Sequence, residues 1–343
     1  MGIREIAEQL GVSSATVSRA LNDRPGVSAE LRDKILEAAS QEGYAPNAYG
    51  RGLATSISQA VGFVVNKASR TFWEDPFYPL IMAGAEEFLS DHGYHILVTT
   101  LDDQTTRPEQ LGLLGGGSLV DGLILAGPFI PASFITRLAG SGIPFVLVDN
   151  SLSQRPVNCV LSDDEGGEYE ATRHLIEHGH QRIVFLSGPA EWASSRERGR
   201  GYRRAMEESD LEPRVLQGKE TTLESGAALM RQVLDEWGDL TAVCAVNDSV
   251  AIGAMRAAGE MGRSTPRDLA VMGFDDINLA AIHQPSLSTM RVFKQRMGYL
   301  AADCLLANIT DHSLPPSKTL VATELVRRES CGCPTEARSD NGK

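Results

Sequence analysis

The sequence predicts an α/β protein with a small three-helix head in front of a larger domain of two lobes, each built on a parallel sheet. Two observations predict this fold. Apolar residues recur at helical spacing through the first 45 residues, and from Ala60 onward short apolar runs alternate with amphipathic helical stretches. Such alternation is typical of parallel sheets with helices on both faces. A chain of 343 residues also exceeds one compact core, so two or three folding units are expected.

Composition limits the partners and the compartment. The formal net charge of -13 disfavours non-specific binding to nucleic acid, so a DNA reader of this composition must concentrate its few cations. No apolar run approaches the roughly 18 residues that span a bilayer, and the charged N-terminus is typical of a helix, not of a signal peptide. We therefore expect a cytoplasmic protein with no membrane partner, whose five cysteines are reduced.

The head has the pattern of a helix-turn-helix. The apolar positions of its first helix are Ile3, Ile6, Ala7 and Leu10. Gly11 permits a sharp turn, and Ser13 or Ser14 can cap a second helix that ends near Leu21. A third helix is expected after Val27, with Ser28 as its cap. An ordinary helical bundle would show the same spacing.

In a helix-turn-helix the second helix enters the major groove, where it must offer small or hydrogen-bonding side chains. The residues that meet this demand are Ser14, Ala15, Thr16, Ser18 and Arg19. The segment 1–57 carries six Lys or Arg residues against seven Asp or Glu residues. Affinity for DNA must therefore come from a directed cluster of cations and from two heads acting together in one dimer.

The segment that follows the head is either a marginal helix or a flexible linker. Asn47 can cap a helical turn after Pro46, yet Gly50 and Gly52 each cost up to about 1 kcal/mol in a helix. Two glycines are equally expected in a flexible linker. Residues 46–59 are thus predicted to be a helix that is stable only in the right complex, or a plain connection.

A ligand cleft is expected between the two lobes. Several of the predicted strands end in a loop with polar or aromatic residues, for example at Asp149, which ends PFVLVD, and at Asp275 in GFDD. In open α/β sheets the carboxyl ends of the strands are where ligands bind. Two such sheets facing each other would enclose the ligand.

The amino-acid sequence resembles those of the lactose-repressor (LacI/GalR) family. The runs that carry the resemblance are IREIAEQLGVSSATVSRALN and VSAELRDKILEAASQEGYAPNAYGRGLAT in the head, then ATRHLIEHGHQRIVFLSGP, AVNDSVAIGAMRA and LAVMGFDDI. The family's sensor is itself similar to periplasmic sugar-binding proteins. The resemblance implies a DNA-binding domain at 1–45, a hinge helix at 46–59, an effector-binding and dimerisation domain at 60–330 and a polar tail at 331–343. It places crossovers between the lobes near residues 160, 289 and 320.

The resemblance also implies which head residues contact DNA. Ser14 and Ala15 would choose bases, and Arg19 would read a base edge. The phosphate anchors would be Thr16, Ser18 and Asn22. Leu53 would insert into the minor groove from the hinge helix. Many members place a longer polar side chain at the position of Ala15, so recognition there is expected to use van der Waals contact with a thymine methyl group.

Effector contacts follow from the same resemblance. They are Phe77, Tyr78, Asp149, Arg198, Asn247 and Asp275. Carboxylates, an amide and a guanidinium suit the hydroxyls of a sugar, while an aromatic face packs on the ring. Each carboxylate taken singly could instead cap a helix at a strand end. Thr221 stands where some members carry a stacking aromatic residue, and Trp192 could supply a replacement face.

These residues predict a repressor of sugar-utilisation genes that binds a pseudo-palindromic operator as a homodimer. A carbohydrate in the cleft would change operator affinity, and the sequence fits an inducer and a corepressor equally well. The alternatives are a corepressor-dependent regulator that senses a purine or another metabolite, a sugar-binding module without DNA readout, and a hydrolase or kinase on the same scaffold.

Several other patterns in the sequence do not predict a site. His174, His178 and His180 resemble metal ligands, but no cysteine or carboxylate at ligand spacing completes the set, and Gly179 is typical of a helix end. No metal, cofactor or catalytic residue is therefore predicted, and no phosphate loop or nucleophile motif supports an enzyme. The last residues show no apolar heptad, which favours a dimer over a coiled-coil tetramer.

Overall fold

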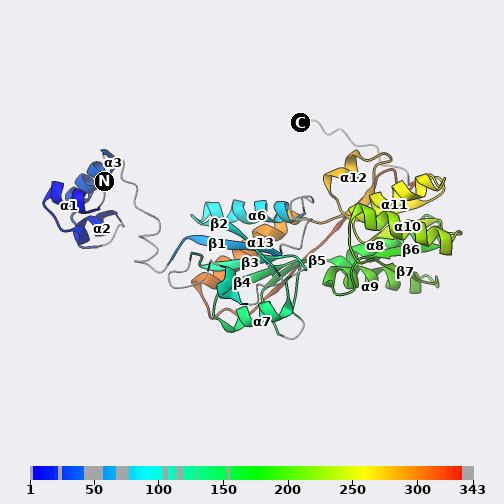
Figure 1. Cartoon of the computed structure of the whole chain (residues 1–343), viewed down its shortest axis with the longest axis horizontal. Helices are drawn as coiled ribbons and strands as arrows, with labels where there is room; N and C mark the ends of the chain where they lie inside the picture. The colour runs from blue at the N-terminus through cyan, green and yellow to red at the C-terminus, as the bar shows by residue number, and fades with distance from the viewer. Residues whose placement is uncertain are drawn as a thin grey trace.

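The computed structural model shows a three-helix head followed by two α/β lobes (Figure 1). The structure describes residues 3–21, 25–41, 57–66, 77–102, 107–111, 113, 119–128, 130–152 and 155–333. The predicted phosphate anchor Asn22, the minor-groove residue Leu53 and the hinge segment 46–56 lie outside these ranges. The predicted fold class is confirmed, since both lobes are built on largely parallel sheets.

The head consists of α1 (Ile3–Leu10), α2 (Ser14–Leu21) and α3 (Ala29–Gln41). Gly11 adopts a φ of 64° in the turn between α1 and α2, a backbone conformation that favours glycine. The caps are Ser13, whose Oγ accepts from the Thr16 amide at 3.1 Å, and Ser28, whose Oγ accepts from the Leu31 amide at 3.4 Å. The small core of the head contains Ile6, Ala7, Val17, Ala20, Ile35, Ala38 and Ala39.

The first lobe is a six-stranded sheet in which every pairing is parallel. In spatial order its strands are β11 (Lys318–Val321), β5 (Cys159–Ser162), β4 (Phe145–Val148), β3 (Gly122–Ala126), β1 (Ala60–Asn66) and β2 (His95–Leu101). The helices α6 (Phe77–Asp91) and α13 (Lys294–Thr310) pack together on one face. The helix α7 (Ala132–Gly140) packs through Phe134, Ile135 and Leu138 into a core that includes Leu123 of β3 and Leu147 of β4. A short 3-10 helix, η1 (Pro108–Leu111), completes this lobe.

The second lobe holds another six-stranded sheet, with one antiparallel edge. In spatial order its strands are β12 (Glu324–Val326), β10 (Ser288–Arg291), β9 (Ala270–Asp275), β8 (Ala242–Ala245), β6 (Ile183–Ser187) and β7 (Arg214–Gln217). Only β12 runs antiparallel to its neighbour among the described pairs. The helices are α8 (Asp164–Glu177), α9 (Ala193–Glu207), α10 (Leu223–Glu236), α11 (Asp248–Glu260) and the short α12 (Asn278–Ile282).

The chain passes between the two sheets three times. It leaves the first sheet after β5 and enters α8, returns after β10 into α13, and crosses again between β11 and β12. Figure 1 shows these passages between the lobes, next to the start of α8. No helix in the described part of the chain is long and apolar enough to cross a membrane.

Glycines allow helices in both lobes to approach backbone to backbone. A Cβ on Gly298 of α13 would overlap the carbonyl of Ile81 in α6, and a Cβ on Gly253 of α11 would overlap the carbonyl of Leu223 at the start of α10. By contrast, a Cβ on Gly259, near the end of α11, would meet no atom within 4 Å. Close helix packing therefore depends on a few glycines and not on all of them.

This contrast gives a matched pair of substitutions within one helix. Gly253→Ala should lower the free energy of unfolding by about 1–3 kcal/mol, because its Cβ meets rigid backbone. Gly259→Ala should leave stability unchanged or raise it by up to about 1 kcal/mol, since alanine favours the helix. Chemical denaturation of the two variants beside the parent checks this. Equal destabilisation by both would contradict the close approach of α10 and α11.

Candidate functional site

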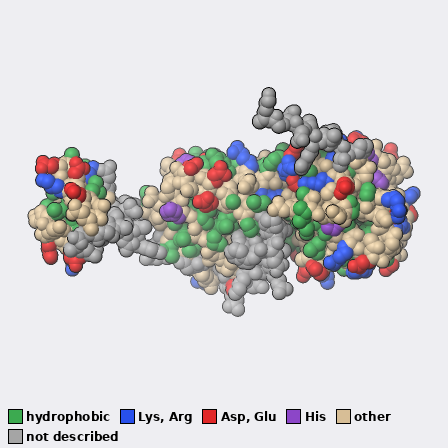
Figure 2. All heavy atoms as spheres, turned by 90° about the horizontal axis from the view of Figure 1, so that it is seen from above, with side chains coloured by type: hydrophobic (Ala, Val, Ile, Leu, Met, Phe, Trp, Pro, Cys, Tyr) green, Lys and Arg blue, Asp and Glu red, His purple; other side chains and the backbone are tan. Residues whose placement is uncertain are grey.

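The second helix of the head presents the residues predicted to contact DNA. Val17 and Ala20 of α2 are buried in the head, which turns the opposite side of the helix outward. Ser14, Ala15 and Arg19 are exposed. Thr16 and Ser18 are half-buried, and the Thr16 hydroxyl lies 2.8 Å from the Ser13 hydroxyl. Both acidic and basic side chains appear on the face of the head in Figure 2, so Arg19 would act as a local cation on a mixed surface.

The structure brings all seven predicted effector residues into one hollow between the lobes. The hollow is narrow, with a cavity volume of about 60 Å³, and it is partly open to solvent. The first lobe contributes Phe77, Tyr78 and Asp149. The second lobe contributes Trp192, Arg198, Asn247 and Asp275, together with Thr221. Effector binding by these residues stays a prediction, but they do converge from different strands and helices.

Arg198 is the buried cation of this hollow. The side chain comes from α9 and is 4% exposed. Its Nε donates to Asp164 at 2.8 Å, its Nη2 donates to Asp275 at 3.3 Å, and its Nη1 donates to the Val246 carbonyl. The guanidinium lies 3.7 Å from the centroid of the Phe274 ring. Burial alone would lower the pKa of Arg198, but Asp164 and Asp275 raise it, so the cation is permanent.

Asp149 is the opposing carboxylate from the first lobe. It accepts a hydrogen bond from the Tyr78 hydroxyl at 2.8 Å. Burial, and next the negative charge of Asp164, raise the pKa of Asp149 to about 7, while Arg198 and the Tyr78 hydroxyl oppose the rise. Its φ of 54° is in the left-handed region, as is the φ of 107° at Asp275. Such strained conformations concentrate at functional sites.

Some residues that line the hollow also have a structural role. The Asn247 Oδ1 accepts from the Val250 amide at 2.9 Å and caps α11, and its Nδ2 donates to the Thr221 carbonyl at 3.2 Å. Asn247 is thus a helix cap and a wall residue together. Gly127 lies behind Tyr78, and a Cβ there would come within 3.1 Å of the tyrosine ring. The φ of 101° at Gly127 also favours glycine.

Two charged residues of the site were missed by the sequence analysis. Asp164 follows a passage between the lobes, and its carboxylate also accepts from the Ser162 hydroxyl at 3.0 Å. Lys294, at the start of α13, is 6% exposed, donates to the Asp275 carbonyl and lies 5.6 Å from the Phe77 ring centroid. The local sequence does not identify Asp164 and Lys294 as site residues, because charged residues are common at the starts of helices. Only the passages between lobes bring them to the cleft.

Comparison with known proteins decides the family. A model described as bacterial regulatory proteins, lacI family, matches residues 2–47, and one described as a periplasmic binding protein-like domain matches residues 172–331. The HTH-type transcriptional regulator CelR of Thermobifida fusca is 32% identical over 95% of this chain and 96% of its own length. The chain belongs to the lacI family.

As a lacI-family member, the chain is a DNA-binding transcriptional regulator and not an enzyme. Catabolite control protein A of Priestia megaterium is 31% identical over 84% of this chain and 86% of its own length. A solved complex of CelR with cellobiose has 31% identity and a TM-score of 0.75 over 96% of this chain and 99% of that one. The lac repressor dimer bound to operator and an anti-inducer has 27% identity and a TM-score of 0.83 over the same shares.

The pKa of Asp149 predicts how stability depends on pH. Because its pKa of about 7 exceeds the ordinary 3.8, the folded chain holds a proton that the unfolded chain releases between these values. Stability should therefore fall as the pH rises through this window, by at most about 1.4 kcal/mol per pH unit from this group. Asp149→Asn should reduce that slope in unfolding experiments at pH 5, 6 and 7.

The matched control is Asp276, which directly follows Asp275 at the end of β9. Burial opposes the effect, but hydrogen bonds from Arg328 and Arg291, at 2.6 and 2.7 Å, lower the pKa of Asp276. Asp276→Asn should therefore destabilise the chain without changing the slope between pH 5 and 7. An unchanged slope in Asp149→Asn would contradict the raised pKa.

Proposed function

We propose that this lacI-family regulator represses sugar-utilisation genes and that a carbohydrate bound between its lobes changes its affinity for the operator. The observation that carries the proposal is the single hollow lined by the seven side chains described above. Carboxylates and a guanidinium pair with vicinal hydroxyls in fixed directions, and the rings of Phe77, Tyr78 and Trp192 offer apolar faces.

The charges of the hollow favour a neutral ligand over an anionic one. Arg198 is the one cation among the described residues that line the hollow, and Asp164 and Asp275 already pair with it, so a phosphate or carboxylate in the cleft would find no free counterion among them. A sugar hydroxyl can donate to a carboxylate and accept from Arg198. Two kinds of relative support a carbohydrate ligand, namely CelR, solved in complex with cellobiose, and the ribose operon repressors. The purine-type alternative has support in the PurR relatives, at 28–29% identity.

The proposed mechanism couples the cleft to the head. In it, residues 1–45 read DNA, 46–59 form the hinge, and 60–330 bind the effector and dimerise. Because the ligand would contact Asp149 of one lobe and Asp275 of the other, its binding would change their relative position. A coupling free energy of about 1–3 kcal/mol, acting equally in both directions, gives about 5 to 150-fold regulation. A regulator that reads an operator works where the chromosome lies, in the cytoplasm.

A homodimer is part of the proposal. Exposed apolar residues are present on the edge strand β2, at Leu97 and Val98, and on α12, where Ile282 is 74% exposed. Exposed apolar side chains of this kind are suited to burial in an interface. The lac repressor, a structural relative, is a dimer on its operator. Two heads at fixed spacing would match a pseudo-palindromic site.

Selection from random duplexes tests the proposal directly. The purified chain, at stated salt, should enrich a pseudo-palindrome with two half-sites. One member of a sugar panel should then change the affinity for that duplex by about 5 to 150-fold, in either direction. If a purine changes the affinity for the duplex and no sugar does, the effector is a purine and the carbohydrate proposal is refuted. If no duplex is enriched, with or without ligand, the proposal that the head recognises a specific DNA sequence is refuted.

Arg19 should carry specificity and not merely charge. Arg19→Ala should weaken binding to the selected duplex by about 1–3 kcal/mol and reduce its preference over random DNA, because a base-edge contact is lost. Lys34→Ala removes one exposed cation from α3, where Lys34 pairs with Glu30, and should keep the preference. Competition assays between the selected duplex and random DNA, run on both variants, check this. Equal loss of preference in both variants would contradict the role of Arg19.

A further inference from the structure

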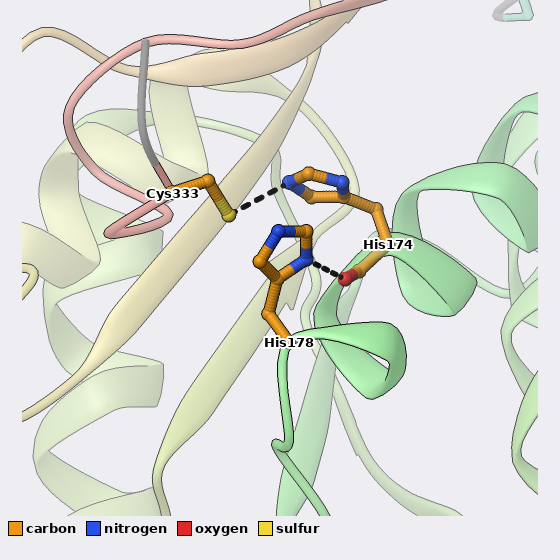
Figure 3. A group of neighbouring side chains, drawn as sticks. All are labelled: His174, His178 and Cys333. Atoms are coloured by element: carbon orange, nitrogen blue, oxygen red, sulfur yellow. Dashed lines mark hydrogen bonds between the residues drawn. The ribbon is translucent and has the colours of Figure 1, made fainter.

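The segment around Cys333 folds onto the C-terminal end of α8, on the second lobe. Cys333 Sγ lies 3.1 Å from His174 Nε2, although 159 residues separate them. His178, at the C-cap of α8, lies beside them (Figure 3). One ligand atom from each of the three residues lies within 4.8 Å of the others. The argument from ligand spacing could not find Cys333, because this cysteine is remote from the histidines in the sequence and only the fold brings it to His174 and His178.

The cysteine segment is fixed by its own hydrogen bonds. Ser330 Oγ accepts from the Ser288 amide at 2.8 Å and donates to the Val271 carbonyl at 2.7 Å. Gly332 turns the chain with a φ of 72°, and both flanking thiols, Cys331 and Cys333, are buried. The backbone therefore places the Cys333 thiol at His174, with a second thiol, that of Cys331, two residues before it, without help from a ligand. Such preorganisation is what a metal site requires of its protein.

The tautomer of His178 is set by a hydrogen bond. Its Nδ1 lies 2.7 Å from the His174 carbonyl, which can only accept, so Nδ1 carries the proton. The lone pair is then on Nε2. Figure 3 shows this second ring nitrogen facing the place where Cys333 and His174 meet. A histidine ligand held by a backbone carbonyl through its other nitrogen is the usual arrangement in metal sites.

We propose that His174, His178 and Cys333 bind a divalent cation of the zinc type, with the thiol of Cys331, which donates to the Arg328 carbonyl at 3.5 Å, turning inward as the fourth donor. Tetrahedral zinc places its nitrogen and sulfur ligands roughly 3.4 to 3.8 Å apart, so the contact between His174 and Cys333 need open by only about 0.5 Å. Imidazole and thiolate donors suit zinc, whereas magnesium and calcium take oxygen ligands.

The site would be structural. It joins the segment around Cys333 to the end of the helix whose first residue, Asp164, holds Arg198. With three buried donors and only His178 exposed, it resembles a closed site more than a catalytic one. A bound cation should stabilise the folded chain, since the unfolded chain does not bring these donors together.

Cobalt is a direct probe of the proposal. The full chain, reduced and freed of metal with a chelator, should bind one Co²⁺ per chain, with the visible bands of tetrahedral cobalt and a thiolate charge-transfer band. Zinc should displace the cobalt and raise the midpoint of thermal unfolding. The thiolate band should be lost in Cys333→Ser, and affinity should fall at least tenfold in His178→Gln, whose exposed side chain can be replaced without loss of folding.

Two matched variants serve as controls. His180→Gln removes the neighbouring histidine outside the cluster, and Cys304→Ser removes a half-buried thiol of the other lobe. Both should bind cobalt as the parent does. The proposal is overturned if the reduced parent shows no thiolate band, if Cys333→Ser retains it, or if Cys331 and Cys333 form a disulfide in protein purified without oxygen.

Discussion

The cleft between the lobes depends on the buried guanidinium of Arg198. Its partners lie at the start of α8, after β8 and at the end of β9, so one side chain connects the ends of three elements of the second lobe. Removing either carboxylate would take one of two hydrogen-bonded counterions from this buried charge, which costs up to several kcal/mol. The position of Asp275 at the cleft, with its unusual backbone, is therefore held by the same interaction that would meet a ligand.

The charged groups of the cleft are divided unevenly between the two lobes. The second-lobe carboxylates Asp164 and Asp275 engage Arg198 directly, while Asp149 stands on the other lobe and accepts from the neutral hydroxyl of Tyr78. Burial, and next the charge of Asp164, raise the pKa of Asp149, whereas the preference for neutral, hydroxyl-rich ligands follows from the pairing of Arg198 with both second-lobe carboxylates. A ligand hydroxyl that donates to Asp149 would add to the hydrogen bond from Tyr78 without bringing a further charge into the cleft.

Local sequence signals predicted a large part of this structure. The caps Ser13 and Ser28, the glycine turn at Gly11 and the long apolar strands each depend on residues close in the chain. The edge strand β7, of sequence RVLQ, has only two apolar residues in a row, so the alternation of apolar runs does not predict it. Asp164, Lys294 and Cys333 were not predicted as neighbours of their sites, because tertiary crossings, which have no local pattern, bring them there.

The three passages between the sheets also determine how the protein can be divided. The first lobe needs α13 and β11, which come after most of the second lobe in the chain, because α13 packs with α6 on one face of the first sheet. Neither lobe is therefore encoded by one continuous segment of the gene. A single recombination event between relatives within the second lobe would therefore combine pieces of both lobes from two parents, whereas the head, encoded as one block, can be exchanged whole.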